Sequence, residues 1–323
     1  MGSNSFGMGD IIMSKSAIVF AGQGAQAVGM GKDLAEAYPD CAVLFKKADE
    51  VLGFSLSKLC FEGPIEELTK SNNCQPAIFV ASIACLKALE KETAGKLDLA
   101  GTAGLSLGEW SALCMAGVIN FEDGLRIMQA RGQYMQEACQ ENAGGMVSII
   151  GLGVDKLKDV CVATGVEMAN INSPEQIVLS GEKEKIKQAE AAAIAAGAKK
   201  AIVLNVAGAF HSKLMSSAAV KLEKFLGGIV MNSPKIPVIS NFTGKPHGSQ
   251  DEIKKAMISQ VTGSVQWVST VEWFRTAGVT RYIEAGPGKV LSGLIKRIDK
   301  ASAINNVQDA VSLKETVASV TAV

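Results

Sequence analysis

The stretch Gly104-Leu105-Ser106-Leu107-Gly108 has the residue types and spacing of a nucleophile turn. In the G-x-S-x-G pattern a serine sits on a sharp strand-to-helix turn, where its hydroxyl projects from the sheet edge and the helix N-terminus favours a developing oxyanion. Small apolar residues precede this stretch, and residues 109–113 have a helical pattern that closes at Gly117. A chain with 33 glycines can match the pattern by chance. The strand–turn–helix setting nevertheless favours Ser106 as a nucleophile.

A nucleophilic serine needs a base, and the chain holds two histidines. His211 follows a predicted strand and a short turn, and a residue at the carboxyl end of a strand in an α/β sheet points into the ligand crevice. His247 lies in a turn rich in glycine and proline, so we expect it to be exposed to solvent. A capping or core role is the alternative for His211, but we favour it as the base.

The stretch Gly22-Gln23-Gly24-Ala25-Gln26-Ala27 follows an apolar run and fits G-x-G-x-x-A, a weak dinucleotide-binding fingerprint. That interpretation needs a second strand ending in Asp or Glu about 20 residues further on. Residues 32–52 have a helical pattern instead. We therefore favour the other use of a tight glycine-rich turn, in which backbone N–H groups face an oxyanion.

Arg131 lies on a predicted helix at residues 121–141, between Met128 and Met135 at helical spacing. It therefore borders the apolar stripe of that helix. Most such arginines lie over a helix and pair with a nearby carboxylate. Spacing alone favours this structural role over contact with a ligand.

The elements that must position these residues alternate between strands and helices. We predict strands at residues 17–21, before Gly104, at 237–240 and at 281–284, and a helix at 121–141 that Asn120 caps and Gly144-Gly145 ends. Between residues 145 and 204 the predicted order is βαββαβ, which is the ferredoxin-like pattern. The strands and helices of this part are predicted at 146–150, 155–163, 166–171, 176–179, 182–196 and 201–204.

The predicted fold is α/β, with a parallel-sheet domain that carries an inserted ferredoxin-like α+β subdomain. Residues 16–143 and 208–312 form the large, discontinuous domain in this prediction, and residues 144–207 form the subdomain. Residues 1–13 are expected to be a disordered leader, because they have neither the basic start nor the apolar run of a secretory signal.

The composition excludes several classes of function. Thirty-two basic residues balance 32 acidic ones, so no global field favours nucleic acid or an anionic membrane surface. The seven cysteines include no C-x-x-C pair, so we expect no metal site and reduced thiols. No stretch reaches the roughly 18–20 apolar residues of a membrane span. We expect a cytoplasmic protein.

Taken together, these motifs resemble the malonyl-CoA:acyl carrier protein transacylases of fatty-acid synthesis, from Ala17 to about Val307. The resemblance rests on ordered matches along the whole chain. They are Phe20-Ala21-Gly22-Gln23-Gly24-Ala25-Gln26, Cys74-Gln75-Pro76-Ala77, Gly104-Leu105-Ser106-Leu107-Gly108-Glu109, Arg131-Gly132-Gln133-Tyr134-Met135-Gln136, Asn172-Ser173-Pro174, Gly208-Ala209-Phe210-His211 and Glu284-Ala285-Gly286-Pro287-Gly288-Lys289-Val290-Leu291.

The resemblance implies a hydrolase-like α/β domain with a ferredoxin-like subdomain, and a ping-pong transfer of malonyl through a serine ester. The family's nucleophile falls on Ser106 and its base on His211. Its oxyanion hole falls on the backbone N–H groups of Gln23 and Leu107, and its malonyl carboxylate site on Arg131.

Two further residues receive roles only from the resemblance. The family orients its histidine with a main-chain carbonyl, which falls on Gln260, and Phe210 resembles the residue of malonyl-selective members. The sequence departs from many members at Leu105, where they have histidine, and at Ala21, where they have proline. Neither side chain performs chemistry. The leucine form is similar to plastid members and to some bacterial ones, so a bacterial cytoplasm and a plastid stroma both stay open.

The implied substrates are malonyl-CoA and the phosphopantetheine arm of acyl carrier protein, without a metal or redox cofactor, and we expect a monomer. Lys213, beside His211, is the first candidate for contact with an acidic carrier protein. Two alternatives stay open at this point: a serine esterase or thioesterase, and a non-catalytic subunit that binds acyl carrier protein.

Overall fold

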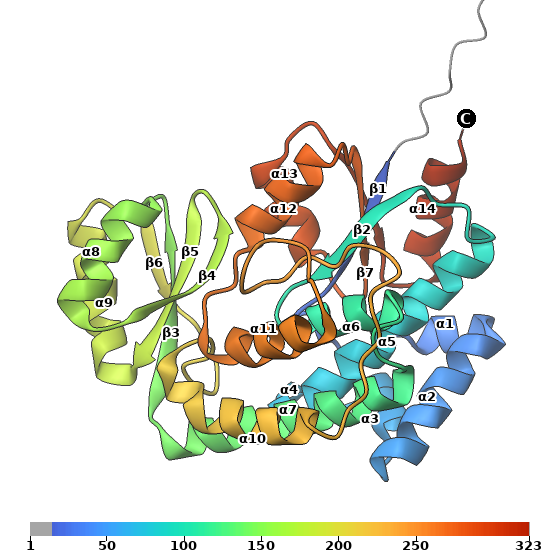
Figure 1. Ribbon diagram of the computed structural model, residues 1–323, viewed down its shortest axis with the longest axis horizontal. Helices are drawn as coiled ribbons and strands as arrows, with labels where there is room; N and C mark the ends of the chain where they lie inside the picture. The colour runs from blue at the N-terminus through green and yellow to red at the C-terminus, as the bar shows by residue number, and fades with distance from the viewer. Residues whose placement is uncertain (1–14, 323) are drawn as a thin grey trace, which may run out of the picture.

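A four-stranded parallel sheet forms the centre of the larger part of the molecule (Figure 1). The computed structural model describes residues 15–322, and the predicted leader at residues 1–13 lies outside them. The strands are β1 (Ser16–Phe20), β2 (Leu99–Gly104), β7 (Arg281–Ala285) and β8 (Ala303–Val307), in the order β2-β1-β7-β8. Every residue of β1 is buried, as expected for a central parallel strand covered on both faces. The predicted parallel sheet is confirmed.

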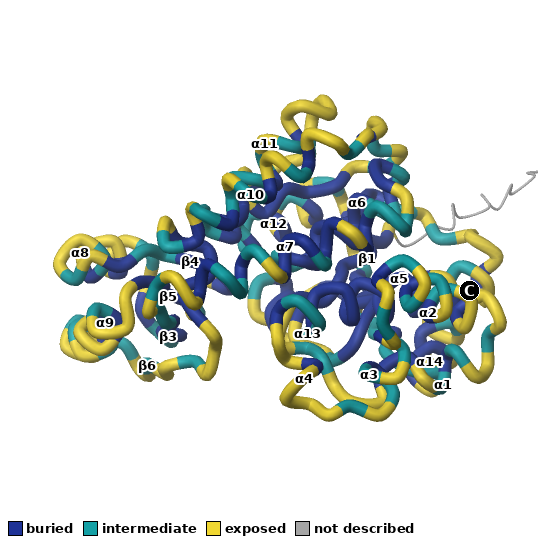
Figure 2. Tube along the Cα trace, turned by 90° about the horizontal axis from the view of Figure 1, so that it is seen from below, coloured by how far each residue is buried: buried dark blue, intermediate teal, exposed yellow. Residues whose placement is uncertain are grey.

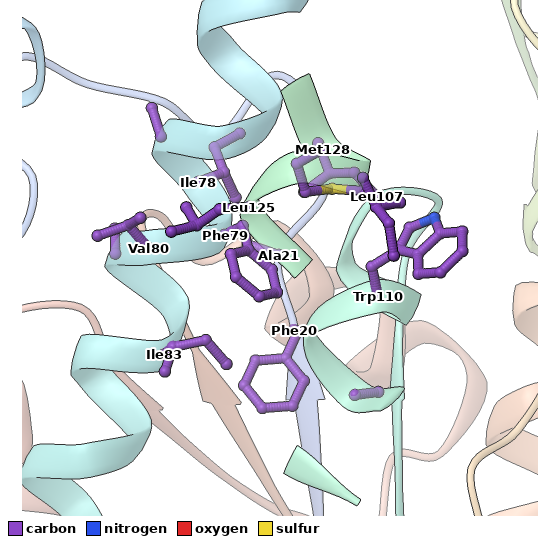
Figure 3. Close-up of a cluster of buried hydrophobic side chains, with 14 of the residues drawn as sticks. Phe20, Ala21, Ile78, Phe79, Val80, Ile83, Leu107, Trp110, Leu125 and Met128 are labelled. Carbon is purple, nitrogen blue, oxygen red and sulfur yellow. The ribbon is translucent and has the colours of Figure 1, made fainter. Parts of the chain in front are cut away.

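Helices cover both faces of this sheet, and the buried chain concentrates around it (Figure 2). The helices of this larger part are α1 (Lys32–Ala37), α2 (Pro39–Leu52), α3 (Leu56–Glu62), α4 (Ile65–Thr69), α5 (Ser71–Glu92), α6 (Gly108–Met115), α7 (Phe121–Glu141), α10 (Ser216–Leu226), α11 (Gln250–Thr262), α12 (Trp267–Thr276), α13 (Val290–Ile298) and α14 (Ala310–Thr321), with a short 3₁₀ turn at Lys213–Met215. Figure 3 shows Phe79 and Ile83 of α5 directed toward Phe20 of β1, while the Trp110 ring of α6 points away from Phe20 and lies beside Leu107. No helix within residues 15–322 is long and apolar enough to cross a membrane.

Helix α7 has the bounds that the sequence predicts, and its predicted apolar stripe is buried. The side chain of Asn120 accepts a hydrogen bond from the backbone N–H of Asp123 at 2.8 Å, so the predicted cap is confirmed. The prediction that Gly144-Gly145 ends the helix is wrong. The helix ends at Glu141 with Asn142 as its C-cap, and both glycines belong to the next strand. A Cβ at Gly144 would lie 2.6 Å from the Ala209 Cβ, so close approach of two chain segments is the reason for glycine there.

A separate antiparallel sheet lies within residues 144–203 (Figure 1). It consists of β3 (Gly144–Ile150), β4 (Glu167–Ser173), β5 (Gln176–Glu182) and β6 (Lys200–Val203), in the order β4-β5-β3-β6. Helices α8 (Val154–Thr164) and α9 (Lys183–Ala195) complete the predicted βαββαβ order. The predicted ferredoxin-like pattern is confirmed, while the domain boundaries 16–143, 144–207 and 208–312 stay a prediction. Backbone hydrogen bonds between residues 169–171 of β4 and Val265 connect this sheet to the larger part.

The sequence prediction differs from the structure at two strands. The predicted strand at residues 237–240 is reduced to isolated bridges, in which Val238 lies parallel to Thr102 of β2 and Ile239 pairs with Pro246. The sequence prediction also missed β8, whose AINNV sequence carries two asparagines. An edge strand that pairs with only one neighbour tolerates such polar residues, so its pattern is weak.

Candidate active site

Ser106 lies on the tight turn between β2 and α6, and its φ is 53°. A left-handed conformation costs a residue with a Cβ about 1–3 kcal/mol, so the surrounding structure must hold it. The flanking glycines are required sterically. A Cβ at Gly104 would lie 2.0 Å from the carbonyl carbon of Gly108, and one at Gly108 would lie 2.3 Å from the Phe20 oxygen. The predicted nucleophile turn therefore exists, because only glycine lets these backbones approach.

His211 faces Ser106 directly. Its Nε2 lies 2.9 Å from the Ser106 Oγ, and its Nδ1 lies 2.7 Å from the backbone oxygen of Gln260. A carbonyl oxygen only accepts, so it fixes the proton on Nδ1 and leaves the Nε2 lone pair toward the serine. Burial, and secondly the positive charge of Arg131, lower the pKa of His211 to about 4. The imidazole is therefore neutral near pH 7, which is the form that accepts a proton.

Arg131 extends from α7 to the same serine. Its Nη2 donates to the Ser106 Oγ and to the Gln260 Oε1, both at 3.0 Å, and its Nη1 donates to the Gln75 Oε1 at 2.7 Å. The residue is only 1% exposed, and burial lowers its pKa to about 10 while the charge of Glu109 opposes that shift. It stays protonated near pH 7.

No Asp or Glu among residues 15–322 forms an ion pair with Arg131. The structural role that spacing alone favoured, pairing with a nearby carboxylate, is therefore wrong. A buried guanidinium whose hydrogen-bond partners are all neutral can bind an external anion.

The glycine-rich turn after β1 lies against the nucleophile turn. A Cβ at Gly22 would lie 2.7 Å from the Leu105 oxygen, and the Leu105 N–H donates to the Phe20 oxygen at 3.1 Å. Within residues 15–322, the backbone N–H groups of Gln23 and Leu107 donate no hydrogen bond to another group. Two free donors on adjoining turns can stabilise an oxyanion beside Ser106.

The chain matches proteins that carry out acyl transfer. The family described as acyl transferase domain matches residues 17–318. The malonyl CoA-acyl carrier protein transacylase of Escherichia coli (strain K12) is 44% identical over 300 residues, which are 91% of this chain and 96% of that protein. That of Bacillus subtilis (strain 168) is 42% identical over 293 residues, 89% of this chain and 92% of that protein.

Solved structures agree with these matches. An acyl carrier protein S-malonyltransferase from Vibrio cholerae has a TM-score of 0.91 at 41% identity, over 94% of this chain and all of that one. A malonyl-transacylase solved in complex with its type II PKS acyl-carrier protein also has a TM-score of 0.91 at 41% identity, over 95% of this chain and all of that one. This chain belongs to the malonyl CoA-acyl carrier protein transacylase family. It is an acyltransferase.

His247, the second histidine of this transacylase chain, is not where the sequence predicts it. Its side chain is only 1% exposed, and its Nε2 lies 2.7 Å from the Glu109 Oε1. The expectation of a solvent-exposed residue is wrong. The reason is that its backbone N–H bonds to the Val238 oxygen, which folds the turn back beside residues 238–240 and directs the imidazole toward α6.

Three polar residues of the transacylase site were missed as functional residues. Asn241 accepts from the Ser106 backbone N–H, Glu109 accepts from the Asn241 N–H, and Gln75 accepts from Arg131. Glu109 and Gln75 stand inside motifs that carry the family resemblance, which was the only available signal. Asn241 follows the weak segment at 237–240 and lies 135 residues from Ser106, so no local spacing could reveal it.

Phe210 is buried, but its side chain packs in the hydrophobic core of the larger part and makes no polar contact with Ser106. Two surface cavities of about 500 and 480 Å³ border α7, the second of them between α7 and α2, and neither is lined by Ser106, His211 or Arg131. Within residues 15–322 no group of three or more His, Cys, Asp or Glu is placed to hold a metal ion.

Proposed function

We propose that the protein transfers malonyl from malonyl-CoA to the phosphopantetheine thiol of acyl carrier protein, through a malonyl ester on Ser106. One observation carries the choice of acyl group. The buried guanidinium of Arg131 reaches the Ser106 Oγ at 3.0 Å and has only neutral hydrogen-bond acceptors. An acyl group that ends in a carboxylate supplies the missing negative charge, and a planar guanidinium can bind both carboxylate oxygens.

In the first half-reaction His211 takes the Ser106 proton on Nε2, and the serine oxygen attacks the thioester carbonyl. Negative charge then develops on the carbonyl oxygen, where the N–H groups of Gln23 and Leu107 donate. When the tetrahedral intermediate collapses, the C–S bond breaks and His211 returns the proton to the coenzyme A sulfur. The Gln260 carbonyl holds the imidazole in the required tautomer throughout.

The second half-reaction repeats these steps with the carrier thiol in place of the serine. His211 takes the thiol proton, the sulfur attacks the malonyl ester, and Ser106 recovers its proton as the ester bond breaks. Such ping-pong transfer requires no metal or redox cofactor. A hydrolytic esterase would have no use for a buried, unpaired arginine beside its nucleophile.

Several finer assignments belong to the same proposal. The relative solved with its carrier protein supports acyl carrier protein as the partner. The relatives from Escherichia coli and Bacillus subtilis are bacterial, which supports a bacterial cytoplasm as the proposed location. We assign Phe210 to the wall of the acyl site, and expect a monomer with neither a nucleic acid nor a membrane among its partners.

The test is the mass of the intact protein after mixing with malonyl-CoA. We expect one added malonyl group, absent from Ser106→Ala and removed on addition of acyl carrier protein. Acetyl-CoA under the same conditions should label more slowly. A malonyl adduct of equal yield on Ser106→Ala, or one that water removes as fast as the carrier does, would contradict the proposal.

A further inference from the structure

Behind Ser106 lies a buried group of four residues that the proposed reaction does not use as reacting groups. We call Glu109, Asn241, His247 and Gln260 the rear network. Glu109 and Asn241 are fully buried, and Gln260 and the side chain of His247 are 1% exposed. The four come from α6, the segment after Ile239, the turn before α11, and α11 itself. Segments distant in sequence therefore meet at one carboxylate.

The Glu109 carboxylate is the centre of the rear network. Its Oε1 accepts from the His247 Nε2 at 2.7 Å. Its Oε2 accepts from the Asn241 N–H at 3.0 Å and from the Gln260 Nε2 at 2.6 Å. An ionised carboxylate can only accept hydrogen bonds, so each of these groups must present a donor to it. Glu109 therefore dictates the orientation of its neighbours.

The orientation matters most at the Gln260 amide, whose oxygen and nitrogen face different partners. The nitrogen donates to Glu109 and to the Ser106 oxygen, and the amide oxygen accepts from the Arg131 Nη2. If the amide turned over, its oxygen would face a carboxylate and its NH₂ would face a guanidinium. Both contacts would then be repulsive. Glu109 thus determines that Arg131 meets an acceptor at this position.

The same helix residue also serves His211, because the backbone oxygen of Gln260 accepts from the His211 Nδ1. A shift of α11 relative to α6 would therefore also move the backbone oxygen that orients the His211 imidazole. Asn241 adds a second connection, since its Oδ1 accepts from the Ser106 N–H at 2.6 Å and its Nδ2 donates to the Gly104 oxygen. The Glu109 carboxylate is therefore connected to Ser106 through Asn241, and to Arg131 and His211 through Gln260.

We propose that Glu109 and His247 are positioning residues for acyl transfer. Through the Gln260 amide they fix the Arg131 fork, and through the Gln260 backbone oxygen they fix the His211 imidazole, both relative to Ser106. This inference rests on the proposed function for its activity readout. The role of His247 is to donate to the Oε1 of Glu109, which keeps the Oε2 directed at Gln260 and Asn241.

The negative charge of Glu109 has a second effect at Arg131. It opposes the lowering of the arginine pKa by burial, yet the carboxylate does not contact the guanidinium, whose hydrogen-bond partners are Gln75, Ser106 and Gln260. The Glu109 charge, separated from the guanidinium by the Gln260 amide, therefore favours the protonated arginine without filling the place of a substrate carboxylate.

The chain offers a direct test because it contains only two histidines. The imidazole ¹H–¹⁵N spectrum of the untagged, histidine-labelled protein therefore contains one set of signals for each. Glu109→Gln should shift the His247 signals by direct contact and also the His211 Nδ1–H signal through Gln260. The matched control is Glu122→Gln, a surface carboxylate 44% exposed, which should shift neither. A Glu109→Gln spectrum in which only His247 moves would overturn the proposal.

The His247 variants test the donor itself and cover the case in which Glu109→Gln does not fold. His247→Gln keeps an N–H donor near the imidazole Nε2, whereas His247→Phe fills the space without one. We expect His247→Phe to shift the His211 signal and to lower the ratio of malonyl to acetyl labelling of Ser106 about 10-fold, as does Glu109→Gln. His247→Gln should retain the wild-type signal and most of the ratio. Equal behaviour of the two His247 variants would overturn the proposal, whereas absence of malonyl labelling in the wild type would instead reject the proposed function.

Discussion

The two sides of Ser106 differ in how far their polar groups are satisfied. In front of the serine, Arg131 has only neutral partners and an unbonded Nε, and the N–H groups of Gln23 and Leu107 have no acceptor among residues 15–322. Behind it, both carboxylate oxygens of Glu109 and both ends of the Asn241 and Gln260 amides are hydrogen-bonded. Hydrogen-bond donors without a partner face the place that a substrate would occupy, and fully hydrogen-bonded groups behind the serine hold its position.

The largest expected effect comes from removing the base on the front side. His211→Ala should slow formation of the malonyl ester by about 10²–10⁴-fold, because general-base assistance contributes about that factor. The measurement is the single-turnover rate of the mass increase with malonyl-CoA. His247→Gln, on the rear side, is the control and should retain most of the rate. A smaller loss for His211→Ala than for His247→Gln would reverse the two roles.

His211, the histidine in front of the serine, should also affect how the free energy of unfolding depends on pH. Its pKa is about 4 in the folded protein and about 6.5 when unfolded, so the unfolded chain binds more protons between these values. Its contribution to stability is complete above pH 6.5 and is lost as the pH falls toward 4. That loss should amount to about 3 kcal/mol.

The comparison for this effect is His211→Gln, which does not titrate. Denaturant unfolding at pH 7 and at pH 4 should show a fall in the free energy of unfolding that is larger in the wild type by that amount. An equal fall in both proteins would mean that the imidazole is not held neutral.

The guanidinium of Arg131, which has no negatively charged partner, should make the protein prefer malonyl over acetyl groups. Arg131→Ala should lose malonyl transfer by about 10- to 150-fold, the equivalent of a charge-assisted hydrogen bond, while acetyl transfer holds or improves. Arg131→Lys should recover only part, because an ammonium lacks the planar fork. The quantity to measure is the ratio of malonyl to acetyl transfer at matched folding. An unchanged ratio would remove Arg131 from the acyl site.

The smallest expected effect comes from substituting Lys213, an exposed residue close to His211. Lys213 is exposed two residues after His211, and its backbone N–H faces the carboxylate of Glu167. Lys213→Glu should raise the KM for an acidic carrier protein a few-fold at low salt, and the difference should shrink as salt rises. The KM for malonyl-CoA serves as the internal control. A carrier KM that responds neither to salt nor to the substitution would place carrier docking elsewhere.

Local patterns predicted the parts of the molecule that local physics determines. Helix α7 and the βαββαβ order of elements in residues 144–203 follow from apolar periodicity and caps, and the nucleophile turn follows from glycine spacing. The rear network could not be predicted in this way. The Glu109–His247 contact joins residues 138 positions apart, and a turn rich in glycine and proline gives no sign of burial. The Gln260 carbonyl was assigned only through family resemblance, and the structure places it 2.7 Å from His211.

Ser106 and His211 both adopt left-handed backbone conformations, with φ values of 53° and 57°, and Ala94 is the other non-glycine residue with positive φ among residues 15–322. Glycine would adopt either conformation without a clash of its Cβ. A laboratory selection for heat resistance alone would therefore reward replacement of the two residues to which we assign the nucleophile and the base. Selections for a more thermostable enzyme of this kind need to measure acyl transfer in every round, because the substitutions that relieve this backbone strain would also remove the activity.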